Sequence, residues 1–124
     1  MQTRPRVLLA DDHAGMVTAL ERMLAPECDV VGVVADGGEV ADAAARLQPV
    51  VSVVDLNLPN VSGLQACRRI LQANPRAKVI LITSMSDETI KAEALAAGAS
   101  DCLSKLAAGN ELVVSIRRAW ADAT

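Results

Sequence analysis

Residues 49–63 read PVVSVVDLNLPNVSG, and this stretch carries the clearest structural signal in the chain. The run Val50–Val54 is short, mostly apolar and rich in β-branched residues, the pattern of a strand buried on both faces of a parallel sheet. Asp55 follows it directly, and burying an unpaired carboxylate in a core would be costly. The favourable place for Asp55 is the carboxyl end of the strand, where open α/β sheets bind ligands. Turn-forming residues come next, so we expect Asp55 at the mouth of a sheet, beside a loop.

Four more apolar runs, bounded by turn-forming residues, predict further strands. The five predicted strands are Arg6–Ala10, Asp29–Ala35, Val50–Val54, Lys78–Thr83 and Asp101–Ser104, and we expect the second to be buried like the third. Apolar residues at helical spacing predict five helices. These helices cover Ala14–Ala25, Glu39–Leu47, Leu64–Ala73, Glu88–Ala97 and a last segment capped by Asn110, and Asp36–Gly38 is predicted as a turn. Gly98 has the position of a C′ residue that ends the fourth helix.

Strands and helices alternate throughout, an order that produces a parallel sheet covered by helices on both faces. We therefore predict an α/β fold: a flavodoxin-like, doubly wound sheet of five strands in the order 2-1-3-4-5, in three layers. A Rossmann-type half-domain is the alternative topology. The 124 residues are enough for one domain with its own core, so we expect residues 1–124 to form a single domain.

The composition argues against several classes of function. The net charge is −3 and Trp120 is the only aromatic residue, so the domain as a whole does not look like a nucleic-acid binder, which would need a basic face and stacking side chains. No apolar run approaches membrane-spanning length, and the N-terminal MQTRPR lacks the apolar segment of a signal peptide. We therefore expect a cytoplasmic protein that contacts no membrane.

The three cysteines are predicted to be structural. Cys28, Cys67 and Cys102 form no CxxC pair, and the chain has a single histidine, so a zinc site is not expected. Free cysteines are among the most buried residues in proteins. We therefore expect three buried, reduced thiols, as in a cytosolic protein.

Polar side chains follow four of the predicted strands. Asp11 and Asp12 end the first strand, Asp55 ends the third, Thr83 ends the fourth, and Lys105 follows the fifth. In the order 2-1-3-4-5 the first and third strands are neighbours, so three carboxylates meet where ligands bind. Carboxylates this close repel one another unless a cation lies among them, and an oxygen-rich site suits Mg²⁺. With a hydroxyl and an ammonium group added, the set suits a phosphoryl group held on a carboxylate nucleophile.

Each of these residues also has an ordinary structural explanation when taken alone. Asp11 or Asp12 would be the N-cap of the first helix. Thr83 would be a strand-end residue, and Lys105 a solvated surface charge. Their joint occurrence at predicted strand ends favours a site. We interpret His13, which follows the acidic pair, as a surface or capping residue rather than a ligand.

The chain resembles a response-regulator receiver domain over essentially its whole length. The resemblance rests on the five residues named above, which occur in order and each at a strand end. The strings LLADDH (residues 8–13) and VVDLNLPNVSGL (residues 53–64) further resemble the NarL/FixJ group. Members of that group usually carry a C-terminal LuxR-type helix-turn-helix. We expect residues 1–124 to be the receiver part, with the output domain absent from this chain.

The resemblance implies a role for each acidic residue. Asp55 is the expected phosphoacceptor, which takes a phosphoryl group from the phosphohistidine of a sensor histidine kinase by in-line attack. Asp12 is an expected direct Mg²⁺ ligand, with Asp11 nearby. Asp55 itself and the backbone carbonyl of Asn57 complete the expected metal site.

The resemblance also implies how the signal would be read. Thr83 would hydrogen-bond the phosphoryl group, and Lys105 would pair with Asp55 or with that group. Movement of Thr83 would then change the face formed by the fourth helix, fifth strand and fifth helix. Many receivers dimerise through this face. Such a protein is a phosphoacceptor rather than a turnover enzyme, and it contacts DNA only through a C-terminal domain.

Two departures from the family pattern affect transmission of the signal. The aromatic residue usually found three positions before the lysine is Cys102 here, so the coupled threonine–aromatic switch is lost in its usual form. The proline that commonly follows the lysine is Leu106. A cis peptide there would cost about 3 kcal/mol rather than below 1, so we expect a trans peptide or a strained loop.

Three alternatives come from other functional classes. A haloacid-dehalogenase-like phosphatase also uses a strand-end aspartate, but it needs a second acid two residues later, where this chain has Asn57. A nucleotide-binding flavodoxin-like domain needs a phosphate loop after the first strand, where this chain has DDHAG. A degenerate or stand-alone receiver that only binds partners is argued against by the intact acid, threonine and lysine set, but Cys102 keeps it open.

Overall fold

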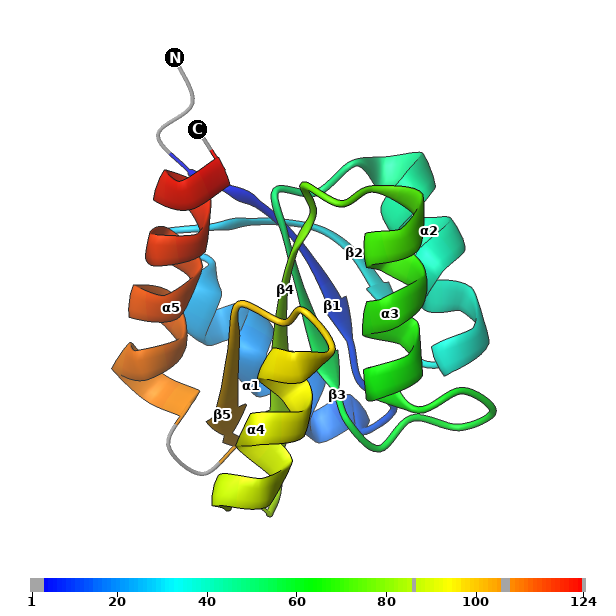
Figure 1. Ribbon diagram of the computed structural model, residues 1–124. Helices are drawn as coiled ribbons and strands as arrows, with labels where there is room; N and C mark the ends of the chain where they lie inside the picture. The colour runs from blue at the N-terminus through cyan, green and yellow to red at the C-terminus, as the bar shows by residue number, and fades with distance from the viewer. Residues whose placement is uncertain (1–3, 86, 106–107, 124) are drawn as a thin grey trace.

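The computed structural model of the protein describes residues 4–85, 87–105 and 108–123. Strands and helices alternate along it as the sequence predicts (Figure 1). The strands are β1 (Arg6–Ala10), β2 (Asp29–Val34), β3 (Val51–Asp55), β4 (Lys78–Thr83) and β5 (Asp101–Ser104). The helices are α1 (Ala14–Leu24), α2 (Val40–Leu47), α3 (Gly63–Ala73), α4 (Glu88–Ala96) and α5 (Ala108–Ala123), with a short 3₁₀ helix, η1 (Gly37–Glu39), before α2.

All five strands pair in parallel, in the order β2-β1-β3-β4-β5. The predicted flavodoxin-like sheet is therefore confirmed. Helices α1 and α5 pack on one face of the sheet, in an apolar cluster that includes Leu20, Val53 and Ile116. Helices α2, α3 and α4 pack on the other face, around residues such as Val54 and Ile70 (Figure 1). No helix among the described residues is long and apolar enough to cross a membrane.

Strand β3 lies in the middle of the sheet, and every one of its residues is buried. Successive side chains point to opposite faces, so Val53 contacts one layer of helices and Val54 the other. The apolar run on either side of Ser52 is therefore explained by burial on both faces, as predicted.

The prediction that the second strand is buried is wrong. Strand β2 pairs only with β1 and forms one edge of the sheet, none of its residues is fully buried, and Val33 is 43% exposed. The predicted order 2-1-3-4-5 already places this strand at an edge of the sheet, with a neighbour on one side only, and an apolar run alone does not show how much of such a strand is covered.

The prediction that Asn110 caps the last helix is also wrong. Helix α5 already begins at Ala108, so Asn110 lies inside its first turn. An N-cap is worth about 1 kcal/mol, which does not prevent helical hydrogen bonding from extending two residues further. The other predicted strand and helix limits agree with the structure to within one residue.

Gly98 ends helix α4 as predicted. Its φ is +99°, its N–H donates to Leu95 O at 3.0 Å, and the Ala99 N–H donates to Ala94 O at 3.1 Å. This pair of bonds is a Schellman motif, and the left-handed backbone at its C′ position favours glycine.

The cysteines are free and buried, as predicted. Burial raises the pKa of all three thiols, and raises that of Cys67 to about 11. Because the thiolate is the reactive form, we expect no alkylation of the native protein by iodoacetamide at about pH 8. Intact-mass spectrometry should show three modifications only after unfolding in guanidinium chloride. Rapid modification of the native protein would contradict the burial of these thiols.

Candidate functional site

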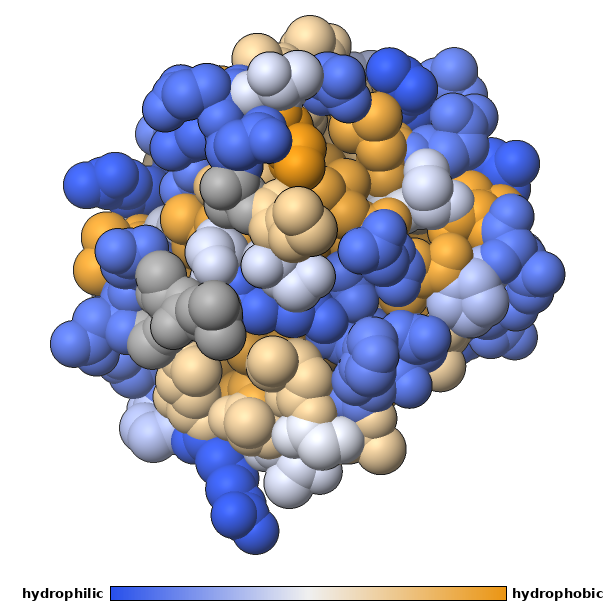
Figure 2. Space-filling view, turned by 90° about the horizontal axis from the view of Figure 1, so that it is seen from below, coloured by the Kyte–Doolittle hydropathy of each residue, from blue (hydrophilic) through white to orange (hydrophobic). Residues whose placement is uncertain are grey.

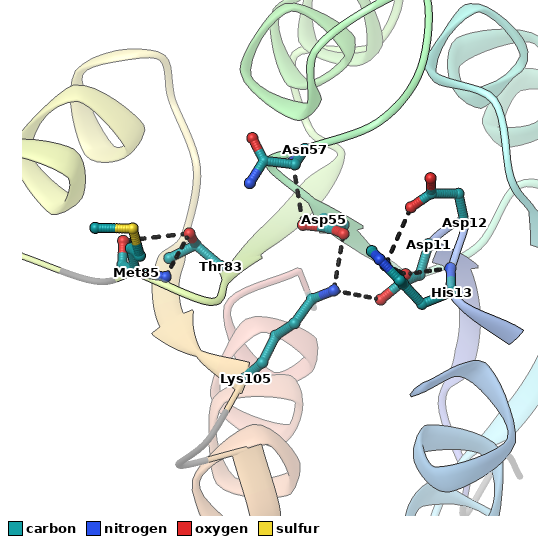
Figure 3. A network of polar contacts seen from close by, with 8 residues as sticks. All are labelled: Asp11, Asp12, His13, Asp55, Asn57, Thr83, Met85 and Lys105. Atoms are coloured by element: carbon teal, nitrogen blue, oxygen red, sulfur yellow. Dashed lines mark hydrogen bonds and ion pairs between the residues drawn. The ribbon is translucent and has the colours of Figure 1, made fainter. Parts of the chain in front are cut away.

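The carboxyl ends of four strands bring the predicted site residues to one edge of the sheet (Figure 3). Asp11 follows β1, Asp55 is the last residue of β3, Thr83 ends β4, and Lys105 follows β5. They share this edge because all the strands run parallel. Figure 2 views the molecule from below, towards this edge, and shows hydrophilic residues lying between hydrophobic ones.

Lys105 bridges two buried carboxylates at the centre of the site. Its Nζ lies 2.8 Å from Asp55 Oδ2 and 2.9 Å from Asp11 Oδ2. Asp11 and Asp55 are only 2% and 1% exposed. Two carboxylates that share one ammonium group retain a net negative charge in a site largely shielded from water, which favours a second cation.

The pKa of Lys105 is raised above its ordinary value of 10.5. Burial is the largest single influence and lowers the pKa, but the hydrogen bonds and charges of Asp55 and Asp11 together outweigh it. The ammonium group is therefore charged throughout the neutral range. Its contribution to stability is present below the ordinary pKa and is lost as the pH rises through the raised value.

The loop after β3 holds Asp55 in place through the backbone. The Asn57 N–H donates to Asp55 Oδ1 at 3.1 Å, and the Gly63 N–H donates to Leu56 O at 2.9 Å. Helix α3 then starts at Gly63, which lies against the backbone of Asp55 and Leu56, and Ser62 is its N-cap, whose Oγ accepts the Gln65 N–H at 3.1 Å. The role of the Asn57 carbonyl as a metal ligand stays a prediction.

The acidic pair after β1 is not an N-cap of α1. The N-cap residue is His13, whose side chain makes no capping bond. Asp11 Oδ1 instead accepts the His13 N–H at 2.9 Å. The His13 side chain is 68% exposed, as expected for a surface residue, but its Nδ1 lies 3.3 Å from Asp11 Oδ1 and 3.2 Å from Asp12 Oδ1. Sequence reasoning missed this proximity, although the position of His13 directly after Asp12 was a signal for it.

Thr83 is buried, and its hydroxyl is engaged within its own loop. Its Oγ1 donates to Met85 O at 3.2 Å and accepts the Met85 N–H at 3.1 Å (Figure 3). Among the described residues, no hydrogen bond joins Thr83 to Asp55. The structure therefore brings Thr83 to the correct edge of the sheet, with its hydroxyl satisfied locally.

Cys102 lies in β5 and is buried in the cluster under α4. It pairs in register with Leu81 of β4, two residues before Thr83. A small thiol therefore occupies the place where the family usually has an aromatic side chain. The expectation for the peptide before Leu106 lies outside the described residues.

The acidic residues form a donor set that fits a divalent cation. Ligand atoms of Asp11, Asp12, His13 and Asp55 all lie within 4.8 Å of one another. Three carboxylates are the hard oxygen ligands that Mg²⁺ prefers, and Lys105 balances only one of their charges. The site therefore fits the predicted metal, with Asp11, Asp12 and Asp55 as candidate ligands.

A family model for the response regulator receiver domain matches residues 7–117. The chain belongs to this family. Receiver domains are in general phosphoacceptors rather than turnover enzymes, and this membership leaves the phosphatase and nucleotide-binding alternatives without support.

Named relatives agree with the resemblance to the NarL and LuxR-type group. The response regulator GacA of Pseudomonas protegens is 37% identical over 118 residues, which are 94% of this chain and 55% of GacA. The DNA-binding transcriptional activator DevR/DosR of Mycobacterium tuberculosis is 35% identical over 117 residues, which are 90% of this chain and 52% of that protein. This chain therefore spans about half the length of these relatives.

The chain is also similar to part of an enzyme and to a response regulator of known structure. A protein-glutamate methylesterase/protein-glutamine glutaminase of Geobacter metallireducens is 36% identical over 102 residues, 79% of this chain and 29% of that enzyme. The crystal structure of a LuxR-family two-component response regulator from Aurantimonas sp. SI85-9A1 has a TM-score of 0.90 and 31% identity, and the match covers 95% of this chain and 86% of that one. Receiver domains of this sequence type thus occur in proteins with different functions.

Proposed function

We propose that this domain is a phosphorylation switch in which Asp55 accepts a phosphoryl group from a sensor histidine kinase, in a reaction that depends on Mg²⁺. The observation that carries the proposal is the buried group of Asp55, Lys105 and Asp11. The Asp55 carboxylate is nearly inaccessible to solvent, and it shares a single ammonium group with Asp11. Such a carboxylate is suited to a reaction that brings further negative charge onto it, as the transfer of a phosphoryl group does.

The proposed transfer forms one bond and breaks one. An Asp55 oxygen attacks the phosphorus of the kinase phosphohistidine in line with the P–N bond, and the kinase imidazole leaves with that bond's electron pair. Lys105 stays paired with the group and offsets part of its added charge. Mg²⁺, held by Asp11, Asp12, Asp55 and the Asn57 carbonyl, would neutralise the charge that develops on the transferring oxygens.

We further propose that Thr83 transmits the phosphorylation of Asp55 from the site to the rest of the domain. To donate to a phosphoryl oxygen, its hydroxyl gives up the bond that it donates to Met85 O. The loop that contains Met85 leads directly into α4. The local exchange of partners would therefore change the face formed by α4, β5 and α5.

The output of the switch is proposed from the relatives. The likeness to DevR/DosR and to the LuxR-family regulator supports control of a DNA-binding domain, and hence of transcription, in the cytoplasm. DNA contact would need such a domain, because this domain carries net charge −3. Dimerisation on phosphorylation through the α4, β5 and α5 face is part of the same proposal.

One observation favours a second candidate function. Cys102 replaces the aromatic residue that usually follows the movement of the threonine, so a receiver that binds partners without productive phosphorylation remains the alternative. In that alternative the acidic site binds Mg²⁺ but takes up no phosphoryl group.

Intact-mass spectrometry after incubation with acetyl phosphate separates the two candidates. We expect the protein to gain one phosphoryl group with Mg²⁺ and none with EDTA. Asp55→Asn should gain none, because the amide is not a nucleophile, whereas Asp42→Asn, at an exposed position on α2, should behave like the parent protein. A folded parent protein that binds Mg²⁺ but gains no mass would support the partner-binding alternative.

A further inference from the structure

His13 places an imidazole nitrogen against the two carboxylates that follow β1. Its Nδ1 lies 3.3 Å from Asp11 Oδ1 and 3.2 Å from Asp12 Oδ1. In Figure 3 the imidazole ring lies over Asp11, on the side of the site opposite Thr83. The three atoms belong to consecutive residues, so one short stretch of backbone brings these side chains together.

Two contacts position the Asp11 carboxylate in this arrangement. Asp11 is nearly fully buried, and its Oδ1 accepts the backbone N–H of His13 at 2.9 Å, which fixes where the His13 side chain begins. The Lys105 Nζ pairs with the other Asp11 carboxylate oxygen, Oδ2, at 2.9 Å. The Oδ1 atom therefore points away from the ammonium group and towards the imidazole.

The distances from His13 Nδ1 to the two carboxylate oxygens match those between adjacent ligands of one metal ion. Zinc-type ions bind imidazole nitrogen and carboxylate oxygen at about 2.0–2.2 Å, so adjacent ligand atoms lie about 3.0–3.5 Å apart in tetrahedral or octahedral sites. Both of these separations in the structure fall within that range. His13 is exposed on its outer side, so an ion can approach from solvent.

We propose that His13 Nδ1 is an additional ligand at this site, and that with Asp11 and Asp12 it makes the domain bind Ni²⁺, Zn²⁺ and similar divalent transition-metal ions. Imidazole suits these ions, whereas Mg²⁺ prefers oxygen ligands and keeps most of its water. His13 therefore adds affinity for transition metals and little for Mg²⁺. This inference rests on the proposed function in that it concerns the same acidic site.

The test is a calorimetric titration of the full chain, without a polyhistidine tag, with NiCl₂, ZnCl₂ and MgCl₂ in turn. We expect His13→Gln to lower the affinity for Ni²⁺ and Zn²⁺ by about tenfold or more, and to change the affinity for Mg²⁺ less than about twofold. Asp12→Asn should weaken the binding of all three ions, because its carboxylate is shared by both kinds of site.

The chain's single histidine allows a second, spectroscopic readout. Long-range ¹H–¹⁵N NMR of the imidazole should show a shift at Nδ1 on addition of Zn²⁺ and none at that nitrogen with Mg²⁺. Equal Ni²⁺ affinities in the parent and His13→Gln, or Zn²⁺ bound through Nε2, would overturn the inference. Mg²⁺ that fails to bind the parent protein would count against the proposed function, while a Ni²⁺ affinity that depends on His13 would still support the inference.

Discussion

Replacing Lys105 by Met is expected to lower the free energy of unfolding by about 3–5 kcal/mol, the usual cost of removing one partner from a buried ion pair. The Lys105 side chain is 9% exposed and pairs with Asp55 and Asp11, which are more deeply buried still. Methionine keeps most of the packing volume but leaves two neighbouring carboxylates without their counter-charge. Urea denaturation, followed by far-UV circular dichroism and by the fluorescence of Trp120, measures the change.

Two controls make this result specific to the charge. Lys91 lies on the exposed side of α4, so Lys91→Met should change stability by no more than about 0.5 kcal/mol. Mg²⁺ should stabilise Lys105→Met more than it stabilises the parent protein, because a bound cation replaces the missing positive charge. A loss below about 1 kcal/mol would show that the carboxylates do not depend on Lys105.

Replacing Gly63 by Ala is expected to cost about 3 kcal/mol or more, at the upper end of the range for overpacked sites. A Cβ at Gly63 would lie 2.1 Å from the Asp55 carbonyl oxygen and 2.7 Å from Leu56 Cα. Both are backbone atoms, which cannot rotate away as a flexible side chain would. Either α3 or the end of β3 must shift, and β3 carries the site.

Gly15→Ala is the matched control for this substitution. Gly15 lies in α1, and a Cβ there would meet nothing within 4 Å, so the helix should gain up to about 1 kcal/mol from the better helix former. Urea denaturation of both variants, together with acetyl phosphate labelling, should show Gly63→Ala less stable and less phosphorylated. Parent-like stability of Gly63→Ala would mean that α3 can move away from β3 at little cost.

Much of the fold follows from local patterns in the sequence. The valines of β3, the helical spacing of apolar residues and the turn residues between them are short-range signals, and they identify five strands and five helices. The alternation of these elements then implies a parallel sheet, and a parallel sheet puts all carboxyl ends on one edge. Asp11, Asp55, Thr83 and Lys105 could therefore be assigned to one site without coordinates.

These sequence patterns fail where contacts between distant parts of the chain decide the local structure or its burial. Both the exposure of β2 and the start of α5 at Ala108 differ from expectation, because an apolar run and a capping residue report only local preference. The close packing of α3 on β3 at Gly63 was likewise invisible, since a glycine before a helix has many possible reasons.

The sequence by itself determined the order of the elements, the doubly wound sheet and the identity of the acidic, hydroxyl and ammonium groups at its edge. Only the tertiary structure decided how those groups pair. It placed Lys105 on both Asp55 and Asp11, turned the Thr83 hydroxyl to Met85, and set His13 Nδ1 against the acidic pair. The physical reason is that sequence periodicity reflects interactions between residues only a few positions apart. Lys105 meets an aspartate 50 positions away only when three neighbouring strands are packed in register.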